Sequence, residues 1–351
     1  MLPQQESSAL ADLCANTSQL RVDGSPVLSS LMFSAGVVGN LVALAILGVH
    51  RKELRTKSSA FCILVTGLAA TDLLGTCFLS PVVFVSYARN ASLLGLAHGG
   101  RGLCQLFAFA MTFFGLASML ILCAMAVERC LAISYPYFYS QHNGRSWAKL
   151  ALPAIYVSSA LFCSLPVLGV GRHKQYCPGT WCFVEMAAGQ PGTAAFSLSY
   201  ATLMALLILA IFLCNGSVSV SLCQMYRQQQ ARRGSLAPTQ RHRKTWFAKG
   251  EEEVDHLVLL ALMTIIFVIC SLPLTIRAYI GGLAPDGYEK DDMLAFRFSA
   301  FNPILDPWIF ILFRKAVFRS LRSLLCWACT GRRRLEPRTL NSSHVPATFS
   351  C

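Results

Sequence analysis

Charged side chains are scarce in this sequence. Asp, Glu, Lys and Arg together make up 13% of the 351 residues, and hydrophobic residues make up 54%. A soluble domain usually carries about 25% charged residues and correspondingly less apolar surface. The composition therefore excludes an ordinary soluble domain and favours a chain whose apolar surface faces lipid.

Acidic residues are fewer than basic ones, with 17 Asp and Glu against 30 Lys and Arg and a formal net charge of +13. Such a balance fits either a nucleic-acid partner or the cytoplasmic loops of a membrane protein. The positions decide between them, because the basic residues gather in alternate loops. We therefore expect the basic loops in the cytoplasm, facing anionic membrane lipid, and no nucleic-acid partner. The loops 51–57, 129–149 and 224–255 hold 4, 3 and 7 Lys or Arg, whereas 88–103, 171–193 and 277–292 hold 2 each.

The start of the chain lacks the basic residues and apolar core of a cleavable signal peptide. Glu6, Asp12 and Asp23 instead fall within residues 1–26. We expect this segment to be extracellular and the first apolar run to act as the insertion signal.

An internal repeat and a catalytic set are also missing. The His residues are scattered and no nucleophile stands beside a recognisable base, so an enzyme is not expected. A transporter or channel is the remaining rival among membrane proteins. Transporter folds often carry internal repeats and paired broken helices, which this sequence does not show.

Seven apolar runs are present, each with the roughly 20 residues that a helix needs to cross the hydrocarbon core of a membrane. A chain in lipid must satisfy its own backbone hydrogen bonds, so these runs predict helices. The expected fold is an all-α membrane protein, a seven-transmembrane helix bundle over residues 27–313. Seven crossings place the N-terminus outside and the C-terminus inside a plasma-membrane protein. The expected spans are 27–49, 58–87, 104–127, 150–170, 194–223, 257–276 and 293–313.

The chain beyond the bundle divides into two expected parts. Residues 314–329 begin with an amphipathic stretch that predicts a short helix 8 on the inner membrane surface. Cys326 and Cys329 end this part and are either palmitoylation sites or plain buried thiols. Cys351 is not a prenylation motif, which needs three residues after the cysteine. Residues 330–351 are expected to be disordered.

Three further positions match short modification motifs. Asn16 and Asn90 each begin an Asn-X-Ser sequence on the expected outer side, so both are candidate glycosylation sites. Ser235 follows two arginines in a cytoplasmic loop and is a candidate phosphorylation site, although such motifs often match by chance.

Four of the 15 cysteines fall on the expected outer side, namely Cys14, Cys104, Cys177 and Cys182. That side is oxidising, so disulfides are expected there. Four cysteines allow three pairings. We favour Cys104 with Cys182, because Cys104 opens the third helix and Cys182 lies mid-loop, so the bond would fix the loop across the mouth of the bundle. Cys14 and Cys177 are then left to pair.

Ionisable residues inside membrane spans are rare, because each costs roughly 2.5–3.5 kcal/mol to insert. Asp72 and Asp306 fall in the second and seventh spans and are expected to face the bundle interior. Either they form a polar network that holds a sodium ion and water, or neighbouring Ser, Asn and backbone groups satisfy them.

Arg297 lies one turn into the seventh span, about 6 Å deep at a rise of 1.5 Å per residue. An arginine that faces a cavity can hold a carboxylate through its planar fork of donors. The alternative is an arginine that reaches the outer interface or pairs with Asp291 or Asp292. We favour the carboxylate interpretation because of the cost of keeping the charge there.

Several short motifs resemble those of rhodopsin-like G-protein-coupled receptors, in the same order along the chain. Three positions depart from the commonest forms, with Cys130 and Phe310 where Tyr is usual and Leu272 at a Trp-like position. These departures, the loop QYCPGTWCF and the stretch around Arg297 are similar to the prostanoid receptors of that class. The shared motifs are Gly39-Asn40, Leu68 to Asp72, Glu128-Arg129-Cys130, Cys270 to Pro273 and Asp306 to Phe310.

The resemblance implies a receptor for a prostanoid lipid that acts through the G protein Gs on adenylyl cyclase and raises cyclic AMP. Among ligands it favours prostacyclin, with prostaglandin E or D as the alternative. Arrestin and receptor kinases are further implied partners, and no cofactor is implied.

The resemblance also implies a ligand site, with the carboxylate on Arg297, Tyr87 and Thr180. The apolar chains would lie among Phe107, Phe109 and Phe296, although a Phe in such a helix is more often a packing residue. For activation it implies that Arg129 leaves Glu128 and meets the G protein; the alternative is an interfacial ion pair with no switch role. The remaining residues implied in the switch are Asp72, Asp306, Pro273 and Pro307.

Overall fold

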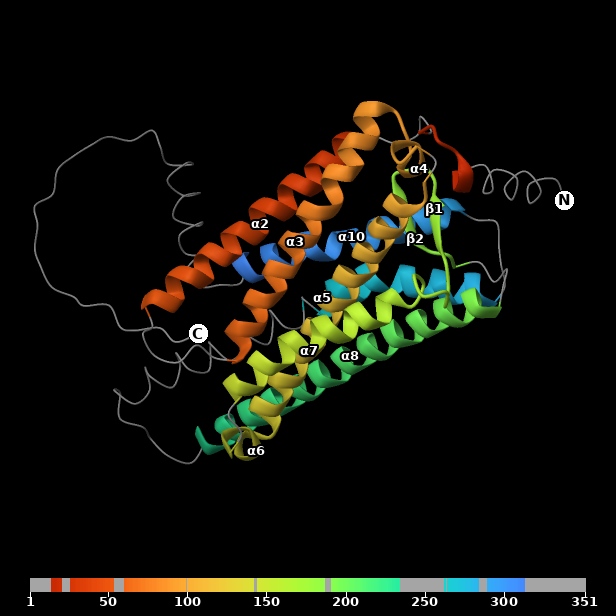
Figure 1. Ribbon diagram of the computed structural model, residues 1–351. Coiled ribbons are helices and arrows are strands. Elements are labelled where there is room, and N and C mark those ends of the chain that lie inside the picture. The colour runs from red at the N-terminus through yellow and green to blue at the C-terminus, as the bar shows by residue number, and fades with distance from the viewer. Residues whose placement is uncertain are drawn as a thin grey trace, which may run out of the picture.

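Seven long helices make up most of the chain that a computed structural model describes (Figure 1). The structure describes residues 14–20, 26–53, 60–98, 100–141, 144–186, 191–233, 262, 264–283 and 289–312. Helix 8 with Cys326 and Cys329, the tail, and Ser235 lie outside the described residues, so these expectations stay predictions. The long helices are α2 (Pro26–Glu53), α3 (Ala60–Arg89), α5 (Gly102–Ser134), α7 (Gly144–Ser164), α8 (Pro191–Arg233), the helix Thr264–Leu283 and α10 (Glu289–Leu312).

Six of these helices are long and apolar enough to cross a membrane by length and composition. The seventh, α10, carries Arg297, Asn302 and Asp306 within it, which lowers its hydropathy. The predicted all-α bundle of seven helices is confirmed.

Several predicted boundaries are wrong because hydropathy marks the lipid-facing part of a helix and not its hydrogen-bonded ends. The third helix was expected to end at 127 but runs to Ser134, so Glu128 and Arg129 lie inside it. The fourth was expected to reach 170 but ends at Ser164, just before Pro166 and the left-handed Gly169. The sixth was expected to end at 276 but continues to Leu283.

A small cap closes one end of the bundle (Figure 1). We call this end of the bundle the hairpin end. Strands β1 (His173–Tyr176) and β2 (Trp181–Val184) pair antiparallel there. The short helix α4 (Leu93–Leu96) lies beside them, and the Ser92 hydroxyl accepts a 3.1 Å bond from a backbone N–H of its first turn. The other end carries the short helix α6 (Pro136–Gln141).

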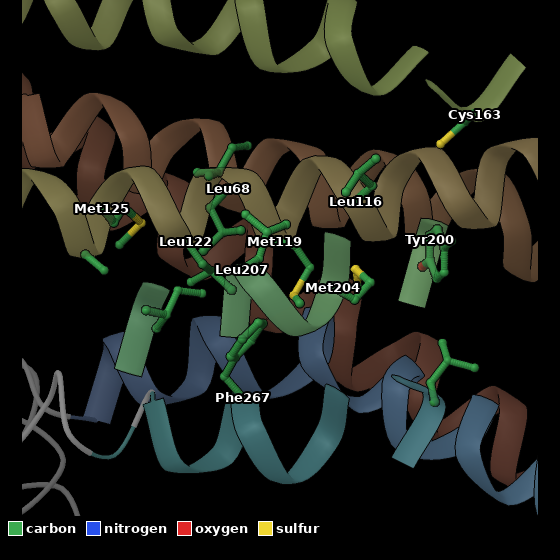
Figure 2. Close-up of a cluster of buried hydrophobic side chains, with 14 of the residues drawn as sticks. Leu68, Leu116, Met119, Leu122, Met125, Cys163, Tyr200, Met204, Leu207 and Phe267 are labelled. Carbon is green, nitrogen blue, oxygen red and sulfur yellow. The ribbon is translucent and has the colours of Figure 1, made fainter. Parts of the chain in front are cut away.

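Helix α5 is the centre of the bundle and packs against α3, α7, α8 and β2. Figure 2 shows its inward side chains, among them Met119 and Leu122, meeting Met204 of α8 and Phe267 of the sixth helix. The core is therefore built from long flexible and aromatic side chains, which fill the irregular space between the packed helices.

Helices α2 and α10 are joined where α10 loses a backbone bond. Pro307 has no N–H, so it cannot bond to the carbonyl of Pro303 one turn earlier. The Asn40 side chain of α2 donates to that carbonyl at 2.9 Å instead. Gly39 lets the helices approach, because a Cβ there would lie 2.8 Å from the indole nitrogen of Trp308. These contacts fix the half of α10 that carries Asp306.

Candidate ligand cavity

A cavity runs inside the bundle from the hairpin end toward its middle. Its upper wall contains Phe107 and Trp181, and its floor contains Asp72 and Asp306. Apolar side chains form most of the wall between them, as in pockets for small apolar ligands. These wall residues come from α2, α3, α5, α8 and the sixth helix, and they include Met32, Phe33, Leu79, Met111, Phe114, Met119, Leu122, Met204, Phe267 and Leu274.

Aromatic rings form a layer at the top of the cavity. Trp181 of β2 meets Phe107 edge-on at 6.5 Å between ring centroids and stacks on Phe296 at 6.3 Å. Phe296 also packs at 5.0 Å against Phe183, so it supports the layer from behind without lining the cavity. Phe109 stacks on Phe113 at 5.9 Å and does not line the cavity either. Of the three predicted apolar contacts, the structure brings only Phe107 to the wall.

The three residues expected to hold a carboxylate lie outside the cavity wall. Thr180 is fully buried between β1 and β2, and its hydroxyl has no partner within the described part of the chain. Tyr87 is half-buried and packs against the cluster that contains Phe107 and Cys182. The structure thus places Thr180 and Tyr87 near the aromatic layer.

Arg297 is half-buried on α10, on the helix face of Ala300 and Ile304, which line the cavity. Asp292, one of its two expected alternative partners, instead pairs with Arg277 at 2.8 Å. The described residues include no hydrogen bond or ion pair of Arg297. The guanidinium therefore lies on the helix face that borders the cavity, with no acidic partner in the described part of the chain.

The floor is a polar cluster. The Ser118 hydroxyl donates to one Asp72 oxygen at 2.6 Å, and the Asn302 amide donates to the Ser271 hydroxyl at 2.9 Å. Asp72 and Asp306 are both 3% exposed. The second Asp72 oxygen, one Asp306 oxygen and the Asn302 carbonyl have no partner among the residues described. No group of three His, Cys, Asp or Glu suited to a metal occurs in that part of the chain.

Ser118, Ser271 and Asn302 were not singled out from the sequence. Each is a polar residue inside an apolar span. Such residues are common, and the sequence does not show whether the side chain faces the interior. The expectation for Leu272 is wrong: this side chain is 41% exposed on the outside of the sixth helix. Its neighbour Ser271 is 1% exposed and takes the inward position above Pro273.

A second polar cluster lies at the end of the bundle away from the hairpin. Glu128 is buried and pairs with Arg129 at 2.8 Å. The Arg129 guanidinium lies 4.1 Å from the centre of the Phe61 ring, close enough for a cation–π contact. The hydroxyl of Tyr139 on α6 donates to Glu128 at 2.7 Å. Burial, and then this bond to Glu128, raise the pKa of Tyr139 to about 12, so the donor keeps its proton.

Two disulfides tie the cap to the bundle, in the pairing that the sequence favours. Cys104 bonds Cys182, and Cys14 bonds Cys177. The buried Gln175 side chain joins the same parts, because it donates to the Cys14 carbonyl at 2.9 Å and accepts from a backbone N–H of α4 at 3.0 Å. The candidate glycosylation residues Asn16 and Asn90 are both exposed beside this cap.

Comparison with known proteins places these features in a family. The 7 transmembrane receptor (rhodopsin family) model matches residues 39–310. The human prostacyclin receptor is 63% identical over 323 residues, 92% of this chain and 81% of that receptor. The rat prostacyclin receptor is 62% identical, over 93% of this chain and 76% of its own length. The human prostaglandin E2 receptor EP2 subtype is 48% identical, over 95% of each chain.

The arrangement of helices is that of solved receptors. A crystal structure of squid rhodopsin superimposes with a TM-score of 0.68 over 96% of this chain and 90% of that one, at 16% identity. That likeness shows the fold alone. With the family match and the high identity to prostacyclin receptors, it shows a multi-pass membrane receptor and not an enzyme. The chain therefore belongs to the rhodopsin family of seven-transmembrane receptors, among its prostanoid receptors.

Proposed function

We propose that prostacyclin activates this receptor and that the receptor acts through Gs to stimulate adenylyl cyclase and raise cyclic AMP. The observation that carries the proposal is the identity with prostacyclin receptors, which exceeds the identity with prostaglandin E2 receptors over nearly the whole chain. Prostaglandin E or D is the alternative ligand, and the same site would serve it.

The carboxylate of the ligand binds Arg297, and Tyr87 and Thr180 complete its site. Two observations on the described residues support this role: the half-buried Arg297 makes no ion pair among them, and the buried Thr180 hydroxyl has no partner among them. A buried polar group without a partner is destabilising, and a ligand would relieve that cost. The apolar part of the ligand lies against Phe107 and Trp181 and extends into the cavity. Phe109 and Phe296 act on it only through the rings that they support.

The hairpin end faces the extracellular side of the plasma membrane, and α6 faces the cytoplasm. The alternation of basic loops and the two disulfides of the cap support this orientation. Asn16 and Asn90 would then be available for glycosylation, and Ser235, Cys326 and Cys329 for cytoplasmic modification. Arrestin and receptor kinases would act on the same side.

Activation is a shift of population toward a form that the ligand binds more tightly. Arg129 leaves Glu128 in that form and contacts the G protein, while Pro273 and Pro307 let their helices bend. A sodium ion between Asp72 and Asp306 belongs to the resting form. The burial of Glu128 and the position of the two prolines inside their helices support this scheme.

Cyclic AMP in cells that express the chain tests the proposal. A stable prostacyclin analogue is titrated beside prostaglandins E and D, with surface expression measured by an epitope tag. A response at the lowest dose of the prostacyclin analogue is expected. A response at a lower dose of prostaglandin E or D would show that this prostaglandin, and not prostacyclin, is the ligand. A receptor that is present at the surface but gives no cyclic AMP response would contradict both the ligand class and the coupling to Gs.

A further inference from the structure

The aromatic layer and the acidic floor belong to one undivided cavity. Phe107 and Trp181 line its upper end, and Asp72 and Asp306 line its lower end. At the intermediate depth the sixth helix presents the small Ser271, while the bulky Leu272 points outward. The cavity beneath the cap therefore extends to the floor.

The floor has more acceptors than donors. Ser118 supplies one donor to Asp72, and the amide of Asn302 is used by Ser271. Three acceptors remain without a donor among the described residues: one oxygen each of Asp72, Asp306 and Asn302. Buried acceptors in this state are destabilising unless a bound group donates to them. The missing chemistry is a hydrogen-bond donor that arrives from the cavity.

The depth of the cavity suits a long acid with a polar group on its far chain. Arg297 and Asp306 are nine positions apart on α10, so about 13.5 Å of helix axis separates them at 1.5 Å per residue. A prostanoid combines a carboxylate at one end with a hydroxyl on its second chain, at a comparable extended length. Its two polar groups therefore match the two polar ends of the site, with the apolar wall between them.

We propose that the hydroxyl on the second chain of the ligand donates to the acidic floor at Asp72 and Asp306. This inference rests on the proposed function, because it needs a prostanoid ligand, and it adds a second anchor opposite Arg297. The floor then binds the far end of the ligand, so it distinguishes prostanoids that carry this hydroxyl from those that lack it. A monovalent cation at the same acids would compete with the ligand chain for the floor.

The test compares two ligands on three variants of the full-length receptor in cell membranes. The ligands are a stable prostacyclin analogue and the same analogue without the second-chain hydroxyl, measured by competition with a radiolabelled prostacyclin analogue. The variants are Asp72→Val, Asp306→Val and the control Thr76→Val. Thr76 lines the cavity, but its hydroxyl already donates to the Asp72 carbonyl at 2.7 Å, so it is not open to the ligand.

The hydroxylated analogue is expected to bind wild type about ten-fold or more tightly than the analogue without the hydroxyl, as for a buried acceptor that gains its donor. This preference is expected to fall to about three-fold or less in Asp72→Val or Asp306→Val and to persist in Thr76→Val. If both acid variants keep the full preference, the hydroxyl lies elsewhere and the proposal is wrong. If the acid variants change the affinity of both analogues equally, and the affinity no longer depends on sodium concentration, the floor is an ion site only.

The wild-type comparison stands even if a variant fails to reach the cell surface. If wild type binds both analogues with equal affinity, the proposed function stands but the hydroxyl does not bind the floor. Wild type that binds neither analogue overturns the proposed function, and the anchor falls with it.

Discussion

The hydroxyl of Tyr139 lies 2.7 Å from the carboxylate of Glu128 and donates a hydrogen bond to it. Glu128 is thus held from two sides, by Arg129 on its own helix and by Tyr139 on α6. Because Arg129 must leave Glu128 for the proposed activation, any group that stabilises the paired carboxylate also stabilises the resting form.

Tyr139→Phe is therefore expected to raise basal cyclic AMP. A hydrogen bond to a charged group contributes about 1.5–3 kcal/mol when buried and less when half-exposed. We expect basal signalling to rise by roughly three- to ten-fold, measured without ligand and normalised to surface receptor. Tyr137→Phe is the control, because Tyr137 lies on the same helix but is 78% exposed. Basal activity at or below the wild-type level would remove the proposed restraint.

Arg297→Ala is expected to weaken binding of a prostacyclin analogue by about 100-fold or more. The reason is the loss of a bidentate, charge-assisted contact to the ligand carboxylate. Arg297→Lys should recover only part of the affinity, because an ammonium cannot form the planar fork. The readout is competition binding, with surface staining to show that the variant folds.

Two controls separate this contact from general effects of charge. A methyl ester of the analogue should lose affinity for wild type but not for Arg297→Ala. Arg277→Gln removes a nearby arginine that already pairs with Asp292 and should keep a large preference for the free acid over the ester. If Arg297→Ala bound the free acid normally, the carboxylate site would lie elsewhere.

How far the sequence predicts this molecule depends on the kind of signal each part leaves. The spans follow from hydropathy, and Arg297 stands out because a charge in an apolar run is rare. Which side of a helix faces the bundle interior is harder to predict, because successive residues are about 100° apart around the helix axis. That step separates Ser271 from Leu272, and only packing against Met119 and Asn302 decides which faces inward. Tyr139 leaves no signal, because its partner lies on another helix, beyond the break at Tyr135 between α5 and α6.

Gln175→Ala is expected to destabilise the cap. The Gln175 side chain is 1% exposed and makes three bonds, to the carbonyls of Cys14 and Thr17 and to the backbone N–H of Leu94. Its loss removes the acceptor of the buried Leu94 N–H, at about 1–3 kcal/mol before water relieves part of it, whereas the Cys14 and Thr17 carbonyls keep the bonds from the Thr17 and Ser92 hydroxyls. A lower thermal midpoint of the purified receptor is expected. Arg172→Ala, an exposed position before β1, should not change the midpoint; an equal fall in both would contradict the role of Gln175.

His173 gives the hairpin a dependence on pH. Burial lowers the pKa of its imidazole from 6.5 to about 4, and its Nε2 atom has no partner in the described structure. Protonation would place a charge in a site that burial has largely removed from water. The unfolded chain binds this proton more readily than the folded one, so the folded state is favoured fully above pH 6.5. That advantage is lost as the pH falls from 6.5 through 4.

The thermal midpoint of the purified receptor is therefore expected to fall between pH 7 and pH 5. One proton contributes at most about 1.4 kcal/mol to the free energy of unfolding per pH unit. His173→Gln cannot titrate and should reduce the slope of midpoint against pH. His98→Gln is the matched control, because His98 is exposed on the same cap and its replacement should leave the slope intact. If both variants keep the wild-type slope, the acid sensitivity arises from other groups and His173 is not its source.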